Sequence, residues 1–515
     1  MQDFVHSQEF KQKCDDLQLD TNKIAKHFSR IKDSVLEHHV SHFSVEDTCR
    51  LDNDGIVDIS EWKQEDGRTP NGYLAFIPAA GVSSRYFDVL KHLKVAIEDK
   101  SVDEIKDALI ELRQTGDTNW YLPKYLKRLL SLETEEVLSM DEKDLMSLAS
   151  NALGETYLPK ALLPYDDKST FLERKFIEHE KLPAVEAQVF VVGNGKTKMF
   201  EPFLERETQK KIVFLEQSPP LSTIRFDSKL NPVLEKNGEL SLVPAGHGVL
   251  TALLWKAKRL FPKMHSAFIK NIDNTVPTDE ASLKWQQRFL SFHQSLVEDM
   301  NKVRTLLDTS VDKADKYVSK MYEKYCGTKT PSKKTQEFIS SVEPNTKNLW
   351  IFLCEFFHLD PNLVEDVFTD VPSDKILNYL YMRPINTMGQ VPNTQNNVGG
   401  TPVFVRFKNS RVKVCLEAAH SSKVDLEKFF KDSSKATHFN PVYVAAELNF
   451  VADHYEHYDD NFWILAKKSY KAETVYYHES VLYELLGNSI MANVVFVEIP
   501  RFLFNPHKSV DSKQA

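Results

Sequence analysis

The loop that follows residue 77 has the composition of a phosphate-binding loop. The apolar run Leu74–Ile77 predicts a short buried strand, and the chain continues as Pro-Ala-Ala-Gly-Val-Ser-Ser-Arg through residue 85. Small residues such as Ala80, Gly81 and Ser83 let backbone N–H groups approach an anion, and a following helix adds a favourable dipole. Arg85 adds a cation that can grip a phosphate with two hydrogen bonds. The loop has one glycine and no Gly-Lys-Ser/Thr, so it is neither a dinucleotide fingerprint nor a P-loop.

Two later segments carry residues that can neutralise and coordinate a polyphosphate. "LPKALLPY" spans residues 158–165 and offers Lys160 as a second cation, which acts as a point charge. "IKNIDNTVP" spans residues 269–277 and places Asp273, followed by Asn274, after an apolar run. Magnesium takes one or two carboxylates and completes its shell with phosphate and water, so Asp273 is the candidate Mg²⁺ ligand.

Two further segments have residue types suited to a nucleoside. Gln217 in "EQSPPL" has both a donor and an acceptor, as reading the edge of a pyrimidine requires. Gly246 and Gly248, on either side of His247, have no side chains and are expected to leave room for a flat base or a ribose. Each segment also has an ordinary interpretation as a turn, a helix cap or a loop with an exposed lysine. Together the segments support a ligand-binding site more strongly than any one of them does, because each follows a predicted strand or begins a predicted helix.

The elements that must position these residues indicate an α/β fold. Apolar, turn-bounded runs alternate with helical stretches, which predicts a mixed, mostly parallel Rossmann-like sheet with helices on both faces. In open sheets of this kind, ligands bind outside the carboxyl ends of the strands. Two helical insertions, residues 86–150 and 280–325, interrupt the pattern. The predicted strands are Leu74–Ile77, Ala187–Val192, Ile212–Leu215, Ala267–Ile272, Pro402–Phe407, Arg411–Leu416 and Val494–Ile499.

A division into three parts follows from the changes in pattern along the 515 residues. Residues 1–68 are mainly helical, residues 69–325 form an α/β part with a helical insertion at about 86–150, and residues 326–515 form a C-terminal α/β part that completes the site. The clearest linker, "CGTKTPSKK", starts at residue 326. Gly, Pro and several lysines over so short a stretch are typical of a connection between domains.

Composition excludes several classes of function. The net charge is −9, whereas a general nucleic-acid binder would be basic. Five scattered cysteines form no CxxC pair and predict neither a disulfide framework nor structural zinc. The N-terminus lacks the apolar core of a signal peptide, and no apolar run approaches the length of a membrane span. We therefore expect a cytoplasmic protein with no membrane partner.

One motif imitates a calcium site. In "RLDNDGIVDISE", residues 50–61, acidic residues fall at several ligand positions of an EF-hand loop. The first position, which should be Asp, is Arg50, and a cation there repels calcium. We expect a polar turn rather than a calcium site.

The order of the motifs resembles that of nucleotide-sugar pyrophosphorylases, especially the UDP-sugar group. The shared features are the loop with Gly81 and Arg85, Pro159-Lys160, Gln217 before two prolines, Gly246-His247-Gly248 and Asn271-Ile272-Asp273-Asn274. The sequence is more similar to the bacterial family DUF4301, whose pattern also includes "RP…GG", "ATHFNP" and "VFVEVP" near the C-terminus. Here those segments are residues 382–405, 436–442 and 492–500. The resemblance covers roughly residues 45–505.

The resemblance implies a fold of the GT-A type and a reaction. A sugar 1-phosphate attacks the α-phosphate of a nucleoside triphosphate, with UTP the first choice, and pyrophosphate leaves. Such transfer needs positioning and charge neutralisation more than covalent catalysis. Arg85, Lys160 and a Mg²⁺ ion on Asp273 would supply both. The loop departs from that of the pyrophosphorylases, which has more glycine, in having alanines at 79 and 80. The family pattern also predicts a lysine near Pro392 or Asn393, and the sequence has none there.

The C-terminal half offers candidates for the second metal ligand and for the sugar side of the site. Glu417 at a predicted strand end is the first choice as the second metal ligand, with Asp425 the second choice. Arg383, His438 and Asn440, together with Asn274, are the candidates for contact with the sugar phosphate. A polar turn beside the sheet and a structural role for His438 and Asn440 are the alternatives.

Three hypotheses of function remain. The first is a Mg²⁺-dependent nucleotidyltransferase that uses a nucleoside triphosphate and a sugar phosphate. The second is a non-catalytic protein on the same fold that binds or senses nucleotide sugars. The third is a scaffold whose long helices bind a partner.

Overall fold

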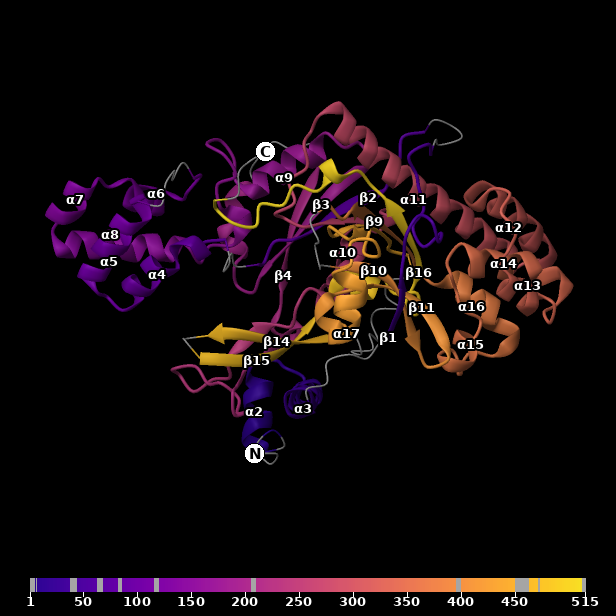
Figure 1. The fold of residues 1–515 in the computed structure, drawn as a ribbon, viewed down its shortest axis with the longest axis horizontal. Helices are drawn as coiled ribbons and strands as arrows, with labels where there is room; N and C mark the ends of the chain where they lie inside the picture. The colour runs from indigo at the N-terminus through magenta and orange to yellow at the C-terminus, as the bar shows by residue number, and fades with distance from the viewer. Residues whose placement is uncertain are drawn as a thin grey trace.

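The predicted strands around the candidate loops form the centre of an eight-stranded sheet in the computed structural model (Figure 1). The order is β12-β9-β13-β8-β2-β3-β4, and β16 pairs with β9 outside this path. The strands are β2 (Tyr73–Pro78), β3 (Val185–Gly193), β4 (Lys211–Gln217), β8 (Ser266–Lys270), β9 (Ile385–Pro392), β12 (His438–Phe439), β13 (Tyr443–Glu447) and β16 (Asn493–Glu498).

The sheet is mostly parallel, as predicted. Parallel pairing joins β8, β2, β3 and β4 in sequence, and it also joins β9 to β16. Because β13 is antiparallel to both β8 and β9, those two strands share one direction. The carboxyl ends of β2, β3, β4, β8, β9 and β16 therefore meet at one edge of the sheet, where ligands bind in such folds.

The structure describes residues 5, 7–37, 44–62, 68–81, 86–114, 120–204, 210–394, 400–449, 463–470 and 473–511. Val82–Arg85 lie outside these ranges, so the predicted roles of Ser83 and Arg85 stay predictions. Within the described ranges, no helix is long and apolar enough to cross a membrane.

Helices cover both faces of the sheet, and the alternation along β2 shows how. Tyr73, Ala75 and Ile77 join an apolar cluster that includes residues of α9 (Phe171–Glu180) and α11 (Glu280–Leu307). Leu74 and Phe76 join a second cluster with residues of α10 (Thr251–Leu260) and α19 (Leu482–Leu486). Successive side chains of a strand point to opposite faces, so a run that is apolar throughout indicates a sheet covered on both sides.

Two predicted strands lie outside the central sheet. Between β10 (Thr401–Phe407) and β11 (Ser410–Leu416) only Lys408 and Asn409 intervene, and so short a turn enforces antiparallel pairing. With β1 (Ser44–Thr48) they form a separate three-stranded sheet. The remaining strands form two small sheets, one of β14 (Trp463–Tyr470), β15 (Glu473–Ser480) and β6 (Phe226–Asp227), and one of β5 (Ser222–Ile224) and β7 (Leu242–Pro244).

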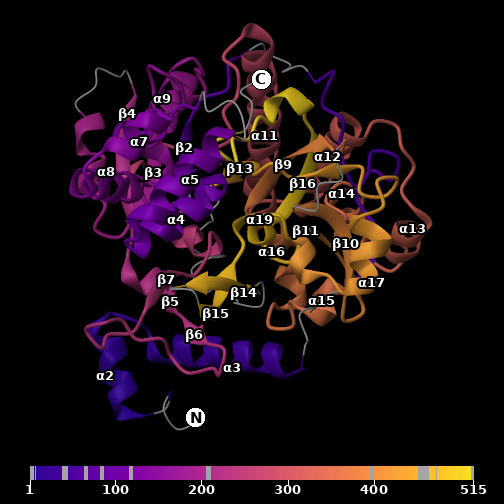
Figure 2. The ribbon, with the colours of Figure 1, turned by 60° about the vertical axis from the view of Figure 1, so that its left-hand side comes forward.

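The helical insertions form separate groups around the sheet. One group lies at the left of Figure 1 and comes forward in Figure 2. It comprises α4 (Lys91–Glu98), α5 (Val102–Gln114), α6 (Lys124–Ser131), α7 (Thr134–Ser139) and α8 (Glu142–Glu155). The helical stretch predicted over 280–325 comprises two helices, α11 and α12 (Val311–Cys326), because the hydroxyl of Ser310 caps a new helix by accepting from Lys313 N.

The other helices lie near the N-terminus and after the linker at residue 326. At the bottom of Figure 1, α2 (Gln8–Asp16) and α3 (Thr21–Glu37) lie below the β14–β15 hairpin. The linker at residue 326 leads to α13 (Lys333–Ile339), α14 (Lys347–Glu355), α15 (Leu363–Asp366) and α16 (Ile376–Met382), and α17 (Lys423–Asp425) follows β11. Segments on both sides of the linker contribute strands to the central sheet.

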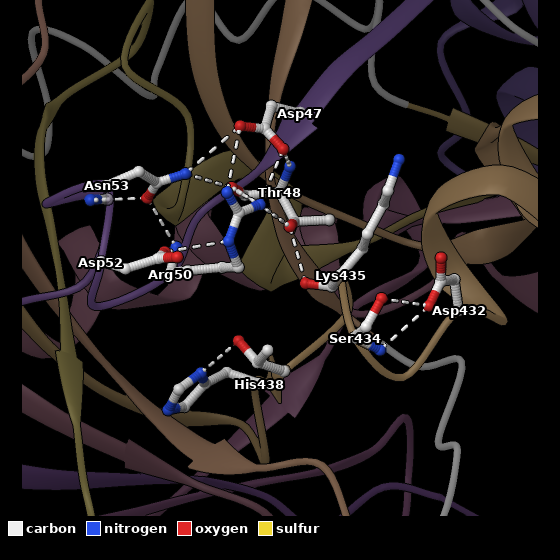
Figure 3. A network of polar contacts seen from close by, with 11 residues as sticks. Asp47, Thr48, Arg50, Asp52, Asn53, Asp432, Ser434, Lys435 and His438 are labelled. Carbon is white, nitrogen blue, oxygen red and sulfur yellow. Dashed lines mark hydrogen bonds and ion pairs between the residues drawn. The ribbon is translucent and has the colours of Figure 1, made fainter.

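In the EF-hand-like loop, the side chain of Arg50 contacts acidic residues of the protein (Figure 3). The guanidinium of Arg50 contacts Asp47 Oδ1 at 2.7 Å and Asp52 Oδ1 at 3.0 Å. The hydroxyl of Thr48 donates to the carbonyl oxygen of Lys435 at 2.6 Å, which ties this loop to the C-terminal half. The carboxylates thus stabilise a turn through a cation that the protein itself provides.

Lys413, a residue of strand β11, is buried in the protein. Lys413 is 1% exposed and its ammonium group lies 5.3 Å from the centre of the Phe496 ring. Burial lowers the pKa of this lysine from 10.5 to about 8, because the charged form is poorly solvated there. A charged Lys413 therefore costs stability in the folded protein.

We predict that Lys413→Met stabilises the protein in a pH-dependent manner. Below pH 8, Lys413 is charged in both the folded and the unfolded chain, so the full penalty for burying the charge is present. Between about pH 8 and pH 10.5 the unfolded chain binds more protons, so the stability of the wild type rises with pH. Below pH 8, the free energy of unfolding of the variant should thus exceed that of the wild type by up to about 3 kcal/mol. This difference disappears above pH 10.5.

Urea unfolding at pH 7 and pH 9.5 measures this difference. Lys320→Met, on the exposed face of α12, is the matched control and should change stability little at either pH. An advantage of Lys413→Met that is the same at both pH values would contradict the prediction.

Candidate functional site

A cavity of about 410 Å³ opens at the carboxyl ends of the parallel strands. Its lining comes from segments far apart in the sequence, including the ends of β8, β11 and β15 and the last described residues of the chain. The chemically important lining residues are His247, Asn271, Asp273, Glu417, Glu479 and Lys508. Four predicted site residues, His247, Asp273, Glu417 and Asn440, thus lie around one cavity.

Lys160 and Asp273 form an ion pair at this edge of the sheet. Lys160 Nζ lies 3.3 Å from Asp273 Oδ2, and the two side chains are 10% and 23% exposed. The ammonium group also donates to the carbonyl oxygen of His507 and lies over the rings of Tyr86 and Phe171, at 4.8 Å and 5.5 Å from their centres. Burial lowers the pKa of Lys160, while Asp273 opposes this shift and Lys508 adds to it.

The local sequence explains how both side chains are held. Lys160 begins a short 3-10 turn directly after Pro159, and its N–H donates to the carbonyl oxygen of Gly81 at 3.2 Å. Asp273 follows β8, and its carbonyl oxygen accepts a hydrogen bond from His507 N at 3.1 Å. Hydrogen bonds and the ion pair therefore connect the loop after β2, the lysine segment and the aspartate segment to one another.

Three buried charges lie behind the aspartate segment. Lys175, Glu178 and Lys270 are all fully buried, and Glu178 forms ion pairs with both lysines. Lys175 also donates to the carbonyl oxygen of Asn274, and burial lowers the pKa of Lys175 to about 7. A buried charge is tolerated when it is paired and hydrogen-bonded, so this cluster fixes the backbone next to Asp273.

The loop after β2 leaves backbone donors for an anion. Ala79 N donates to the carbonyl oxygen of Val191 at 2.7 Å, and its methyl group is buried in the core. In the part of the chain that the structure describes, the N–H groups of Ala80 and Gly81 donate to no acceptor. Among the described residues, nothing lies within 4 Å of a Cβ added at Gly81.

The two glycines around His247 serve chain packing, which corrects our expectation. We expected them to leave room for a base or a ribose. Instead, a Cβ at Gly246 would lie 2.3 Å from the carbonyl oxygen of Ser480, and one at Gly248 would lie 2.4 Å from Ser480 Cβ. The end of β15 occupies that room, while His247 itself is exposed and lines the cavity.

Gln217 has one amide atom without a hydrogen-bond partner among the described residues. It ends β4, opposite Gly193 of β3, and it is 6% exposed. Its Nε2 is buried and has no hydrogen-bond partner among the described residues. Three strand spacings separate β4 from β8, or about 14 Å, so Gln217 lies at the same edge as Asp273 but outside the cavity.

Glu417 lies in an acidic part of the cavity. It follows β11, and its N–H donates to Glu484 Oε1 at 2.6 Å. Glu484 is fully buried and contacts His420 Nδ1 at 2.5 Å. Burial and the negative charge of Glu484 raise the pKa of Glu417 to about 7, so a cation bound here must compete with a proton.

The donors fit a Mg²⁺ ion that arrives with a phosphate ligand. Asp273 and Glu417 line the same cavity, and Mg²⁺ is held in many phosphate sites by one or two carboxylates. In the described part of the chain, no group of three His, Cys, Asp or Glu side chains could hold a metal by itself. Asp425, the second choice of ligand, instead accepts a hydrogen bond from Val45 N at 3.4 Å, beside β1.

Two of the candidates for the sugar-phosphate side have structural roles, which corrects the prediction. Arg383 precedes β9, at the opposite edge of the sheet, where it is 1% exposed and contacts Ser489 O and Asn493 Oδ1, both at 2.7 Å. Asn274 is 1% exposed, and its amide group bonds to Leu503 O at 3.2 Å and Asn505 N at 2.8 Å. Neither side chain faces the cavity.

The other two candidates lie at the correct edge with their polar atoms engaged. His438 Nε2 contacts Glu498 Oε2 at 2.7 Å. Asn440 lines the cavity, but its amide group bonds to Gly389 O at 2.9 Å and Val442 N at 2.8 Å. Asn440 therefore shapes the cavity wall through the backbone, and contact of either residue with a sugar stays a prediction.

Two segments that contribute to the site were not predicted from the sequence. The first is the end of β15, where Glu479 and Ser480 line the cavity. The second, here named the C-terminal segment, is Leu503–Val510, which crosses the site and contacts Lys160, Asp273 and Asn274. Its sole sequence signal is a lysine after "NPH", in a stretch with no recognisable motif.

We predict that Gly246→Ala destabilises the protein more than Gly238→Ala. Both glycines have positive φ, +87° and +82°, so alanine is strained at either position. Nothing lies within 4 Å of a Cβ at Gly238, whereas one at Gly246 would overlap the backbone of Ser480. Strain alone costs about 1–2 kcal/mol, and the overlap adds about 1–3 kcal/mol at Gly246.

Melting temperatures of the two variants measure this difference. A shift for Gly246→Ala no larger than that for Gly238→Ala would show that Ser480 does not fix the loop.

Comparisons with known proteins give several distant structural neighbours and one protein family. No curated protein matches the chain. A mutant of the UDP-glucose pyrophosphorylase from Leishmania major, in complex with UDP-glucose, is 12% identical, with a TM-score of 0.44, over 96% of this chain and 76% of that one. A UDP-glucose phosphorylase from Trypanosoma brucei is 18% identical, with a TM-score of 0.40, over 68% of this chain.

The chain covers 60% of the Trypanosoma protein, and the same share of several structures of the Leishmania enzyme. The match to a protein family is much more extensive. It spans residues 7–513 and is to the family described as "Domain of unknown function (DUF4301)". The protein is a member of the DUF4301 family.

Proposed function

We propose that the protein is a Mg²⁺-dependent nucleotidyltransferase that joins a nucleoside triphosphate, with UTP the first choice, and a sugar 1-phosphate. The observation that carries the proposal is the pairing of Lys160 with Asp273 beside a cavity at the carboxyl ends of the parallel strands. The order of the sequence motifs supports it, because the five segments expected to surround a nucleotide occur in one chain. The description of the family itself states no activity.

The reaction needs no covalent intermediate with the protein. A phosphate oxygen of the sugar 1-phosphate forms a bond to the α-phosphorus, the bond from that phosphorus to the bridging oxygen breaks, and pyrophosphate leaves with the electron pair. Catalysis of this step depends on holding the reactants in line and stabilising the charge that moves to the leaving group. Cations placed in advance provide this stabilisation at little cost of reorganisation.

The chain's own residues divide this work. The N–H groups of Ala80 and Gly81, which donate to no acceptor among the described residues, would donate to phosphate oxygens, and Lys160 lies next to them because its N–H bonds to the carbonyl oxygen of Gly81. Asp273 and Glu417 would hold the Mg²⁺ ion, which neutralises phosphate charge when it is bound. Asp273 also keeps the ammonium group of Lys160 at the edge of the cavity.

We assign binding of the base to Gln217, at the end of the edge strand β4. Gln217 Nε2 is a buried donor without a partner in the described residues, and an unmade hydrogen bond at such a site favours a ligand that completes it. The separation of about 14 Å between β4 and β8 is one that an extended nucleotide can bridge. UTP is the first choice because a uracil edge presents both a donor and an acceptor to the glutamine.

We predict that pyrophosphate is released when the protein is incubated with Mg²⁺, UTP and a panel of sugar 1-phosphates. Lys160→Ala and Asp273→Asn should each lower kcat/KM by about 100-fold or more, because each removes charge stabilisation from the transition state. Asp167→Asn, an exposed change a few residues beyond Lys160, is the control and should leave the rate unchanged.

Thermal stabilisation by nucleotides separates the remaining alternatives. Stabilisation by UTP without release of pyrophosphate from any sugar phosphate would contradict the enzyme and favour a nucleotide-sugar sensor. No stabilisation by any nucleoside triphosphate would contradict both and leave the scaffold.

A further inference from the structure

The cavity contains more negative than positive charge. Among its described lining residues, Asp273, Glu417 and Glu479 are carboxylates, and Lys508 is the one lysine or arginine. A triphosphate that enters such a cavity is repelled unless cations stand near its oxygens. Lys160, next to the cavity, already contacts Asp273 and the carbonyl oxygen of His507. A protein cation in addition to Lys160 would therefore strengthen the binding of a polyphosphate.

The C-terminal segment presents one face to the cavity. Phe504, Pro506 and Lys508 line the cavity, and they alternate with residues that contact other parts of the protein. Between them, Asn505 N donates to Asn274 Oδ1 at 2.8 Å, and the ring of His507 packs against Tyr165 at 5.2 Å. An alternation with a period of two is that of an extended chain, so Lys508 is directed to the cavity by the backbone.

The backbone on both sides of Lys508 is anchored. His507 N donates to Asp273 O at 3.1 Å, and Val510 N donates to Tyr86 O at 2.9 Å. The side chain of Lys508 is exposed, and in the described structure its ammonium group takes part in no ion pair. A lysine with a fixed backbone and a free ammonium group can follow a ligand without a large change of the chain.

We infer that Lys508 is a phosphate-binding residue, which contacts the triphosphate or the sugar phosphate opposite Lys160. This inference rests on the proposed function, and it assigns a further cation, in addition to Lys160 and the predicted Arg85, to the C-terminal segment. The family pattern places a lysine near residues 392–393, where this chain has Pro392 and Asn393. The C-terminal segment supplies a lysine to the cavity from a different part of the chain.

Binding of inorganic tripolyphosphate with Mg²⁺, measured by titration calorimetry on the full chain, tests the inference without requiring turnover. Lys508→Ala should weaken binding about tenfold, because a charge-assisted contact with phosphate is lost. Lys508→Arg should keep the affinity within about threefold, and Lys508→Glu should weaken it more than alanine does. Lys127→Ala, at an exposed position of α6, is the matched control and should bind as the wild type does.

The outcomes separate this inference from the proposed function. If Lys508→Ala binds tripolyphosphate within twofold of the wild type, the role of Lys508 is refuted even when the wild type releases pyrophosphate. If the wild type binds tripolyphosphate through Lys508 but releases no pyrophosphate from any pair of substrates, the enzyme is refuted and the phosphate site stands. Equal melting temperatures of the Lys508 variants and the wild type confirm that weaker binding is not unfolding.

Discussion

The ion pair between Lys160 and Asp273 joins three parts of the chain that are distant in sequence. A largely buried ammonium group must be neutralised or hydrogen-bonded, and here Asp273, the carbonyl oxygen of His507 and two aromatic rings share that task. The lysine segment, the end of β8 and the C-terminal segment can satisfy one another only when the sheet is complete. The geometry of the site therefore depends on the fold of the whole chain.

The centre of the sheet could be predicted because its strands are apolar on both faces. Runs such as Phe-Ile in β2 and Val-Phe-Val-Val in β3 are buried on either side, and local patterns suffice to detect them. The strand β9 was missed, since it carries Asn386, Gly389 and Gln390 in a fully buried stretch. The amide of Asn386 donates to Leu486 O at 2.8 Å, a partner 100 residues away that no local pattern reveals.

The candidate site residues fall into two groups, those that the fold brings to the edge of the cavity and those whose polar atoms bond to other parts of the protein. Lys160, Asp273, Glu417 and His247 were predicted from residue type and position, and the fold brings them to one edge. Arg383 was predicted from the same kind of evidence, yet its guanidinium satisfies buried backbone oxygens at the other edge. Residue type predicts which groups a side chain can bond but not whether its partner is a ligand or the protein. Lys508 illustrates the reverse error, because a lysine without a motif is directed to the cavity by tertiary contacts.

The contact between Lys160 and His507 also explains how a phosphate site can remain ordered without a ligand. The carbonyl oxygen of His507 is a neutral acceptor that accepts a hydrogen bond from the buried ammonium group. A phosphate oxygen carries negative charge, so it attracts the ammonium group more strongly than the partial charge of a carbonyl oxygen does. Exchange of one acceptor for the other then needs a small movement of the side chain. Under the proposed function, the lysine is held near its working position, and the binding energy of the phosphate is not consumed in ordering it.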